Sequence, residues 1–216
     1  MKQGWKKAFL NNWYNLSVFI AGLLAVVLAA GNWDARQRML LGSSAVIFLH
    51  FFEEFGFPGG FAPMGMKVEL RITDPDASHW PLNQLNAMVG NWLFAVLVYV
   101  LPLFLPNVKF LTLAAALFAF LEVLMHAFVF NIALKKVYNP GFATAVFGLL
   151  PISLCYFTGI WGQHLYSGVD IVLAVVWMAF NYWLGFRSPL YKKLGSMSDR
   201  YGFAPEEVAK GDRFVK

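Results

Sequence analysis

Long apolar stretches separated by short polar breaks dominate the pattern of this chain. Six stretches approach the ~20 residues that a helix needs to cross the hydrocarbon core of a bilayer. They run over residues 15–31, 39–57, 84–105, 109–134, 142–163 and 168–187. The pattern therefore predicts an all-α fold, a polytopic membrane helical bundle with about six transmembrane helices.

The breaks between these stretches differ in character. Lys135, Lys136 and the sequence YNPG at 138–141 separate the fourth stretch from the fifth. Pro151 lies inside the fifth stretch, where a proline is tolerated when neighbouring groups satisfy the freed backbone. The loop at 58–83 begins with PGGFAPMG, which is too apolar for an ordinary solvated loop. We therefore expect this loop to dip back into the membrane, shielded by protein, and to line the entry to the site.

Composition supports the membrane assignment. The chain has 216 residues, of which 59% are hydrophobic and 13% are charged. Soluble domains average about 45–50% apolar and about 25% charged residues. The first apolar run ends in GNWD, which is not a typical signal-peptide cleavage site, so we expect it to be retained as a span. Residues 1–187 then form a single transmembrane helical domain, and residues 188–216 form a cytoplasmic C-terminal tail.

The distribution of positive charge predicts the orientation in the membrane. With the N-terminus in the cytoplasm, 14 of the 17 Lys and Arg residues fall on the cytoplasmic side. Without the tail the ratio is still seven to three, which is the positive-inside pattern. We predict an integral membrane protein with cytoplasmic N- and C-termini, which in a bacterium would lie in the inner membrane. The same pattern accounts for the net charge of +5 without a nucleic-acid partner.

Three glutamates and two histidines interrupt the apolar pattern. His50, Glu53 and Glu54 share one face of the second stretch, because residues three and four apart lie on the same side of a helix. Glu122 and His126 share a face of the fourth stretch for the same reason. A charged group at the centre of a membrane helix costs ~2.5–3.5 kcal/mol on insertion scales. Five such groups in one bundle therefore predict a common function.

The two groups lie at a similar depth. At a rise of ~1.5 Å per residue, His50 lies roughly 10 Å and His126 roughly 12 Å from the inner ends of their helices. Asn91 and Asn181 lie near that depth, and Asn86 lies near the start of the third stretch. We interpret these asparagines as substrate-binding or supporting residues of one site. The alternative is that they only join helices, which is the commoner role of asparagine in membrane helices.

The stretch HFFEE at 50–54, followed by FPGGF, resembles the signature of the HXXEE family of small bacterial integral membrane proteins. The resemblance extends from about residue 40 to about residue 185 and includes the later Glu–His pair and the YNPG break. It implies a metal-dependent membrane enzyme, and it carries over His50, Glu53 and Glu54 as signature positions. The resemblance implies no particular substrate.

Two histidines and several carboxylates on facing helices are a typical set of metal ligands. We predict one divalent metal, preferably zinc, held by His50, Glu54, Glu122 and His126. Glu53 would be the catalytic base, although the sequence leaves the roles of Glu53 and Glu54 interchangeable. The predicted function is a metal-dependent hydrolase that acts on a lipid-like or other apolar small molecule near the cytoplasmic leaflet.

Three alternatives use the same residues. A di-iron site would suit an oxidase, desaturase or oxygenase of a lipid-soluble substrate, but such sites in helical bundles use four glutamates. A proton-coupled transporter would use buried acids and histidines as a relay, although the chain shows no inverted repeat. A hydrogen-bonded network that only fixes helix packing would need no metal.

Overall fold

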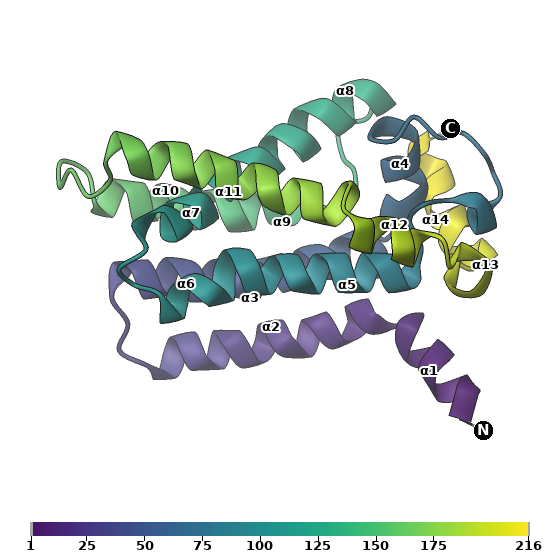
Figure 1. Ribbon diagram of the computed structural model, residues 1–216, viewed down its shortest axis with the longest axis horizontal. Helices are drawn as coiled ribbons and strands as arrows, with labels where there is room; N and C mark the ends of the chain where they lie inside the picture. Colours follow the sequence, from purple (N-terminus) through teal and green to yellow (C-terminus); the bar gives the residue numbers. More distant parts are fainter. Residues whose placement is uncertain (1, 216) are drawn as a thin grey trace.

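The computed structural model describes residues 2–215, and within this range every regular element is a helix. This confirms the predicted all-α class. Figure 1 shows the long helices lying side by side along the long axis of the molecule. They are α2 (Trp13–Ala30), α3 (Ala35–Phe55), α5 to α6 (Gln84–Phe104), α7 to α8 (Lys109–Leu134), α9 to α10 (Phe142–Gly159) and α11 (Gly168–Phe186).

Five helices are long and apolar enough to cross a membrane, in agreement with five of the predicted spans. The helix outside this set is α3, which has 21 residues but carries Arg36, Arg38, Glu53 and Glu54. The charged residues at its two ends lower its mean hydropathy, although its length is sufficient to cross a bilayer. That α3 is a sixth membrane span therefore stays a prediction.

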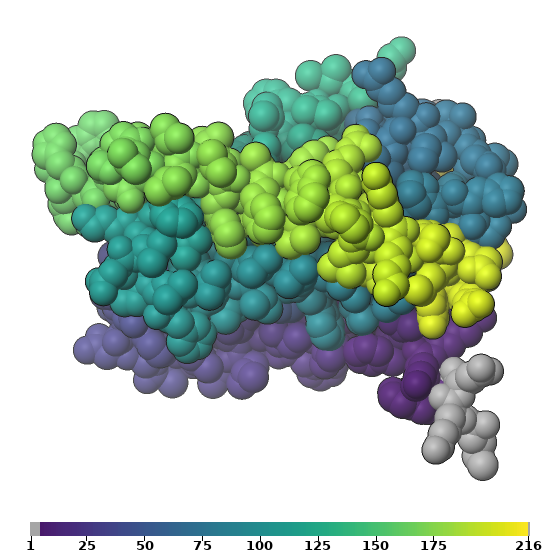
Figure 2. All heavy atoms as spheres, viewed as in Figure 1, coloured from purple at the N-terminus to yellow at the C-terminus, as the bar shows by residue number. Residues whose placement is uncertain are grey.

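The outer surface of the bundle suits a lipid environment. Val172, Val175 and Val176 on α11 are all exposed. Figure 2 shows this helix crossing one face of the molecule over the chain between residues 84 and 134. Large exposed apolar surfaces on helices of this length are typical of membrane proteins.

Three of the long helices contain a π-helical segment, at η2 (Val96–Val100), η3 (Leu124–Phe130) and η4 (Ala145–Leu149). Pro102 and Pro151 follow the first and the last of them by two residues. Proline lacks the N–H of a regular helix, and a wider turn before it accommodates the missing bond. The middle segment has no proline but contains a predicted ligand, and π segments often lie at functional sites.

The short helices gather at one end of the bundle, together with both chain ends (Figure 1). The short elements are α1 (Lys2–Leu10), α4 (Phe61–Val68), η1 (Ala77–His79), α12 (Pro189–Gly195), α13 (Ser198–Tyr201) and α14 (Pro205–Val215).

The loop after α3 folds back against the protein, while its return into the membrane stays a prediction. Its helix α4 is buried from Phe61 to Met66, and α14 packs directly on it. The backbones meet at Gly60 and Gly211, where a Cβ on Gly60 would lie 2.9 Å from the Cα of Gly211. Lys210 Nζ also donates a hydrogen bond of 3.2 Å to the carbonyl of Gly56.

Glu207 of α14 joins the C-terminal segment to the bundle. Its two carboxylate oxygens each accept a hydrogen bond of 2.7 Å from Nε2 of Gln84. One of them also accepts from the hydroxyl of Tyr14 at 3.2 Å. The C-terminal segment is thus held against α2 and α5, while the domain boundary near residue 187 stays a prediction.

Candidate metal centre

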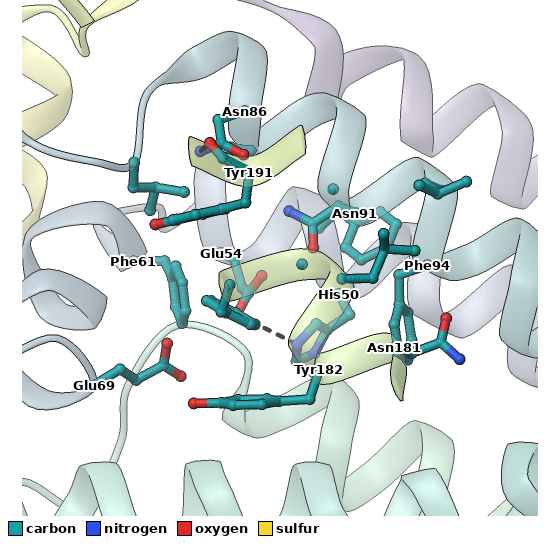
Figure 3. A pocket seen from close by; sticks show the side chains of 18 of the residues that line it. His50, Glu54, Phe61, Glu69, Asn86, Asn91, Phe94, Asn181, Tyr182 and Tyr191 are labelled. Carbon is teal, nitrogen blue, oxygen red and sulfur yellow. Dashed lines mark hydrogen bonds and ion pairs between the residues drawn. The ribbon is translucent and has the colours of Figure 1, made fainter. Parts of the chain in front are cut away.

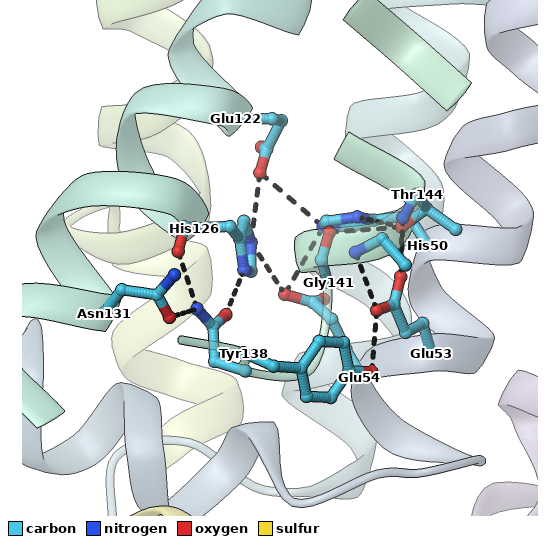
Figure 4. A network of polar contacts seen from close by, with 11 residues as sticks. His50, Glu53, Glu54, Glu122, His126, Asn131, Tyr138, Gly141 and Thr144 are labelled. Atoms are coloured by element: carbon cyan, nitrogen blue, oxygen red, sulfur yellow. Dashed lines mark hydrogen bonds and ion pairs between the residues drawn. The ribbon is translucent and has the colours of Figure 1, made fainter. Parts of the chain in front are cut away.

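Four of the predicted site residues converge between α3 and the α7 to α8 helix. Nε2 of His50 lies 3.4 Å from Oε1 of Glu54 and 3.5 Å from Oε2 of Glu122. Nε2 of His126 lies 3.6 Å from the same Glu54 oxygen and 3.3 Å from the same Glu122 oxygen. Figure 4 shows the contacts that join these residues. The two histidines and Glu54 are buried, and the side chain of Glu122 is 15% exposed.

Thr144 fixes the orientation of the His50 ring. Its hydroxyl lies 2.8 Å from Nδ1 of His50 and donates its own proton to Oε2 of Glu53 at 2.5 Å. The hydroxyl oxygen must therefore accept a hydrogen bond from Nδ1–H. This places a ring proton on Nδ1, so that a neutral His50 presents the lone pair of Nε2 to Glu54 and Glu122.

Asn139 does the same for His126. Its Nδ2 donates to the backbone carbonyl of His126 at 2.6 Å and to Oδ1 of Asn131 at 2.8 Å. Because a carbonyl only accepts, these contacts fix which end of the amide is the oxygen. Oδ1 of Asn139 lies 2.6 Å from Nδ1 of His126 and accepts its proton. The lone pair of this second Nε2 also faces the centre.

The YNPG sequence is a support for the site as well as a break between helices. Tyr138 donates a hydrogen bond of 2.9 Å to Glu53, and Asn139 holds His126. Gly141 has φ of +100° and lies against the ring, where a Cβ would be 2.2 Å from Cε1 of His126. Sequence reasoning missed these roles. The available signal was the position of this polar, glycine-containing break, which directly follows the helix that carries His126.

The adjacent glutamates point to different partners. Glu53 accepts hydrogen bonds from the backbone N–H groups of Ala143 at 3.0 Å and Thr144 at 2.8 Å. These groups open α9, and the first N–H groups of a helix have no partner inside it. With the hydroxyls of Tyr138 and Thr144, the Glu53 carboxylate has four donors. The structure thus engages Glu53 in capping, while Glu54 faces both histidines.

The distances at the centre suit a single ion. Zinc lies about 2.0–2.2 Å from nitrogen and oxygen ligands, so the edges of a tetrahedral site are about 3.3–3.6 Å. The N–O separations from Oε2 of Glu122 to Nε2 of His126 and to Nε2 of His50 are 3.3 and 3.5 Å. In addition, His50, Glu122 and His126 offer ligand atoms that all lie within 4.8 Å of one another. This buried His–Glu–His group has the geometry to hold a metal ion.

A family comparison agrees with the motif. Residues 41–156 match a family described as "Protein of unknown function with HXXEE motif". The match spans more than half of the chain and includes both ligand-bearing helices and the YNPG sequence. This chain belongs to the HXXEE family. Comparisons with curated proteins and with solved structures gave no match. The function of this HXXEE protein therefore has to be inferred from the site.

A cavity of about 190 Å³ lies beside the centre, and the four candidate ligands line it (Figure 3). Asn86, Asn91 and Asn181 line the same cavity, as expected from their depth. Asn86 donates to the carbonyl of Pro81 at 2.8 Å, and Asn181 donates to the carbonyl of Trp177 at 2.9 Å. Within residues 2–215, the side chain of Asn91 has no hydrogen-bond partner. The amide of Asn91 is therefore available to a bound molecule, as is Oδ1 of Asn181, which is buried without a partner.

Glu69 is a cavity residue that sequence reasoning missed. It lies just after α4, which brings it from the loop at 58–83 to the wall of the cavity. Burial, together with the smaller effect of the nearby Glu54 and Glu122 carboxylates, raises the pKa of its carboxyl from 4.5 to about 8. No local pattern marks this residue, because its position depends on the whole loop folding back.

Proposed function

We propose that this HXXEE protein is a metal-dependent membrane enzyme, a zinc-type hydrolase that acts on an amphiphilic, lipid-like substrate. The observation that carries the proposal is the fixed orientation of His50 and His126. In the neutral form of both rings the proton lies on Nδ1, so two nitrogen lone pairs face two carboxylate oxygens at 3.3–3.6 Å. A divalent cation between these four atoms would offset the two buried carboxylates.

The residues at the centre divide into ligands and a base. His50, Glu122 and His126 would hold the ion, since catalytic zinc sites typically use three protein ligands and keep a position open for water. A bound divalent ion lowers the pKa of water and polarises a carbonyl oxygen. Glu54 lies beside both histidine nitrogens and is placed to take a proton from water and return it to the leaving group.

In this arrangement Glu53 is a positioning residue. It is joined to His50 through the hydroxyl of Thr144, in the way that carboxylates commonly orient histidine ligands of metals. This differs from the role of base that the sequence suggested for it. The reason is geometric, because its four hydrogen-bond donors already occupy its oxygens.

The supply of charge favours one ion over two. With Glu53 engaged in capping, Glu54 and Glu122 are the two carboxylates that meet at the centre, and they offset one divalent ion. A di-iron site of the helical-bundle type would draw on about four glutamates. The clustering of the polar groups beside one cavity supports a reaction site more than a proton relay across a membrane. We also propose α3 as the sixth span, with cytoplasmic chain ends following from the positive-inside pattern.

Metal analysis of the protein purified in detergent without chelators tests the proposal. We expect about one zinc per chain in the wild type and loss of the zinc in His50→Ala and in His126→Ala. His79→Ala is the matched control, because this histidine is 64% exposed and contacts Asp74 away from the centre. Two irons per chain would support the di-iron alternative, and no stoichiometric metal in the wild type would refute both.

The catalytic role of Glu54 has a separate test. Glu54→Gln should keep most of the bound zinc, because the three ligands remain, but should lose hydrolysis of a long-chain ester such as 4-methylumbelliferyl palmitate. Thr144→Val should weaken zinc binding by roughly 10–100-fold, the usual effect of removing a group that orients a histidine ligand. Equal ester hydrolysis by wild type and Glu54→Gln would remove Glu54 as the base.

A further inference from the structure

The cavity beside the centre has room for part of a lipid-sized molecule. Its volume of about 190 Å³ is many times the roughly 10–15 Å³ that holds a single water, so a small polar group fits inside. Two lining residues, Tyr182 and Leu190, are 47% and 40% exposed, so the wall of the cavity reaches the apolar outer surface of the bundle. An amphiphile can therefore place its polar group inside and leave its chain in the bilayer.

Negative charge dominates this cavity. Glu54, Glu69 and Glu122 line it, and no lysine or arginine is among the described residues of its wall. A divalent ion at the centre would offset two of the three carboxylates. Glu69 would remain, because within residues 2–215 it has neither a hydrogen-bond donor nor a cationic partner.

Aromatic rings lie around the Glu69 carboxylate. Figure 3 shows Phe61, Tyr182 and Tyr191 around the space that this carboxylate faces. Aromatic faces attract ammonium groups, and the attraction is strongest where water is excluded. A carboxylate among aromatic rings, without a competing cation, is therefore the environment that suits a protonated amine. The free amide of Asn91, across the cavity, can bind a second polar group of the same molecule (Figure 3).

We propose that the cavity binds an amphiphile whose polar group carries a protonated amine, and that Glu69 selects this amine. The inference rests on the proposed function only in taking the bound molecule as the substrate. With the ion in place, an anionic head group would still meet the uncompensated Glu69 carboxylate and no cation from the cavity wall, so phosphate- or carboxylate-bearing lipids are poor occupants. The pKa of Glu69 is raised mainly by its burial and, to a smaller extent, by the two nearby carboxylates.

Binding of three probes with the same chain length tests the proposal. Hexadecylamine, hexadecanol and palmitate would be titrated into the full-length, metal-loaded protein in a non-ionic detergent, with binding followed by native mass spectrometry. We expect the amine to bind at least about tenfold more tightly than the alcohol, and palmitate to bind most weakly. Glu69→Gln should bring amine and alcohol to the same affinity. Asp74→Asn, which neutralises an exposed acid outside the cavity, should keep the preference.

Equal binding of amine and alcohol by the wild type would overturn the proposal, and so would a preference that survives in Glu69→Gln. Metal content measured on the same samples separates this inference from the proposed function. Glu69→Gln should retain its zinc, which also shows that the variant folds. Wild type without metal but with a Glu69-dependent amine preference would refute the hydrolase and support the amine site. Metal-loaded wild type that shows no preference for the amine would refute the amine site and leave the proposed function standing.

Discussion

Gly141→Ala is a small change that should act directly on a candidate metal ligand. The new Cβ would lie 2.2 Å from Cε1 and 2.8 Å from Nε2 of His126. Carbon atoms in contact lie roughly 3.5–4.0 Å apart, so the ring would have to retreat by more than about 1 Å. The hydrogen bond of 2.6 Å to Asn139 opposes this movement.

The expected effect has two parts. The first is backbone strain of about 1–3 kcal/mol, because φ at this position is +100° and side chains disfavour that region. The second is loss of the ligand geometry, since a shift of about 1 Å is large beside the 3.3 and 3.6 Å contacts of His126 Nε2. We expect zinc affinity to fall by at least about 10–100-fold, as when a group that orients a ligand is removed.

Competition with a chromophoric zinc chelator measures this affinity. Gly162→Ala is a matched control, because Gly162 also has a positive φ of +79° but has open space where a Cβ would lie. Gly162→Ala therefore introduces similar backbone strain but adds no contact to the candidate metal ligands. If Gly141→Ala binds zinc within about threefold of Gly162→Ala, the assignment of His126 as a metal ligand is wrong.

Two further predictions concern the loop after α3 and the helix that covers it. In the metal-free protein the pKa of Glu69 is raised from 4.5 to about 8, so the folded chain holds a proton that the unfolded chain releases. Its thermal midpoint should therefore fall as pH rises from about 4.5 to about 8, and Glu69→Gln should reduce that fall; identical pH profiles would contradict this. Gly211→Ala should release α14 from α4, because its Cβ would lie 2.0 Å from Cγ of Pro63. Limited trypsin digestion should then cleave near Lys210 faster than in wild type, and equal rates would count against the packing.

The sequence was sufficient for the features that depend on neighbouring residues. The predicted stretch at 109–134 is the observed helix Lys109–Leu134, and the stretch at 142–163 begins at the observed residue 142 and ends four residues later than the helix. Helices in an apolar environment form from local hydrogen bonds, so their positions follow the apolar pattern. The pairs His50–Glu54 and Glu122–His126 are equally local, because residues four apart meet on one helix face.

The tertiary structure alone decided how the centre is completed. Adjacent residues on a helix point about 100° apart, so only the packing of α9 against α3 shows that Glu53 caps a helix while Glu54 faces the histidines. Thr144 reaches His50 across 94 positions of the chain, and Glu69 reaches the cavity by the folding back of a loop. Contacts at such separations depend on how helices pack against one another, and no local pattern of hydrophobic and polar residues encodes that packing.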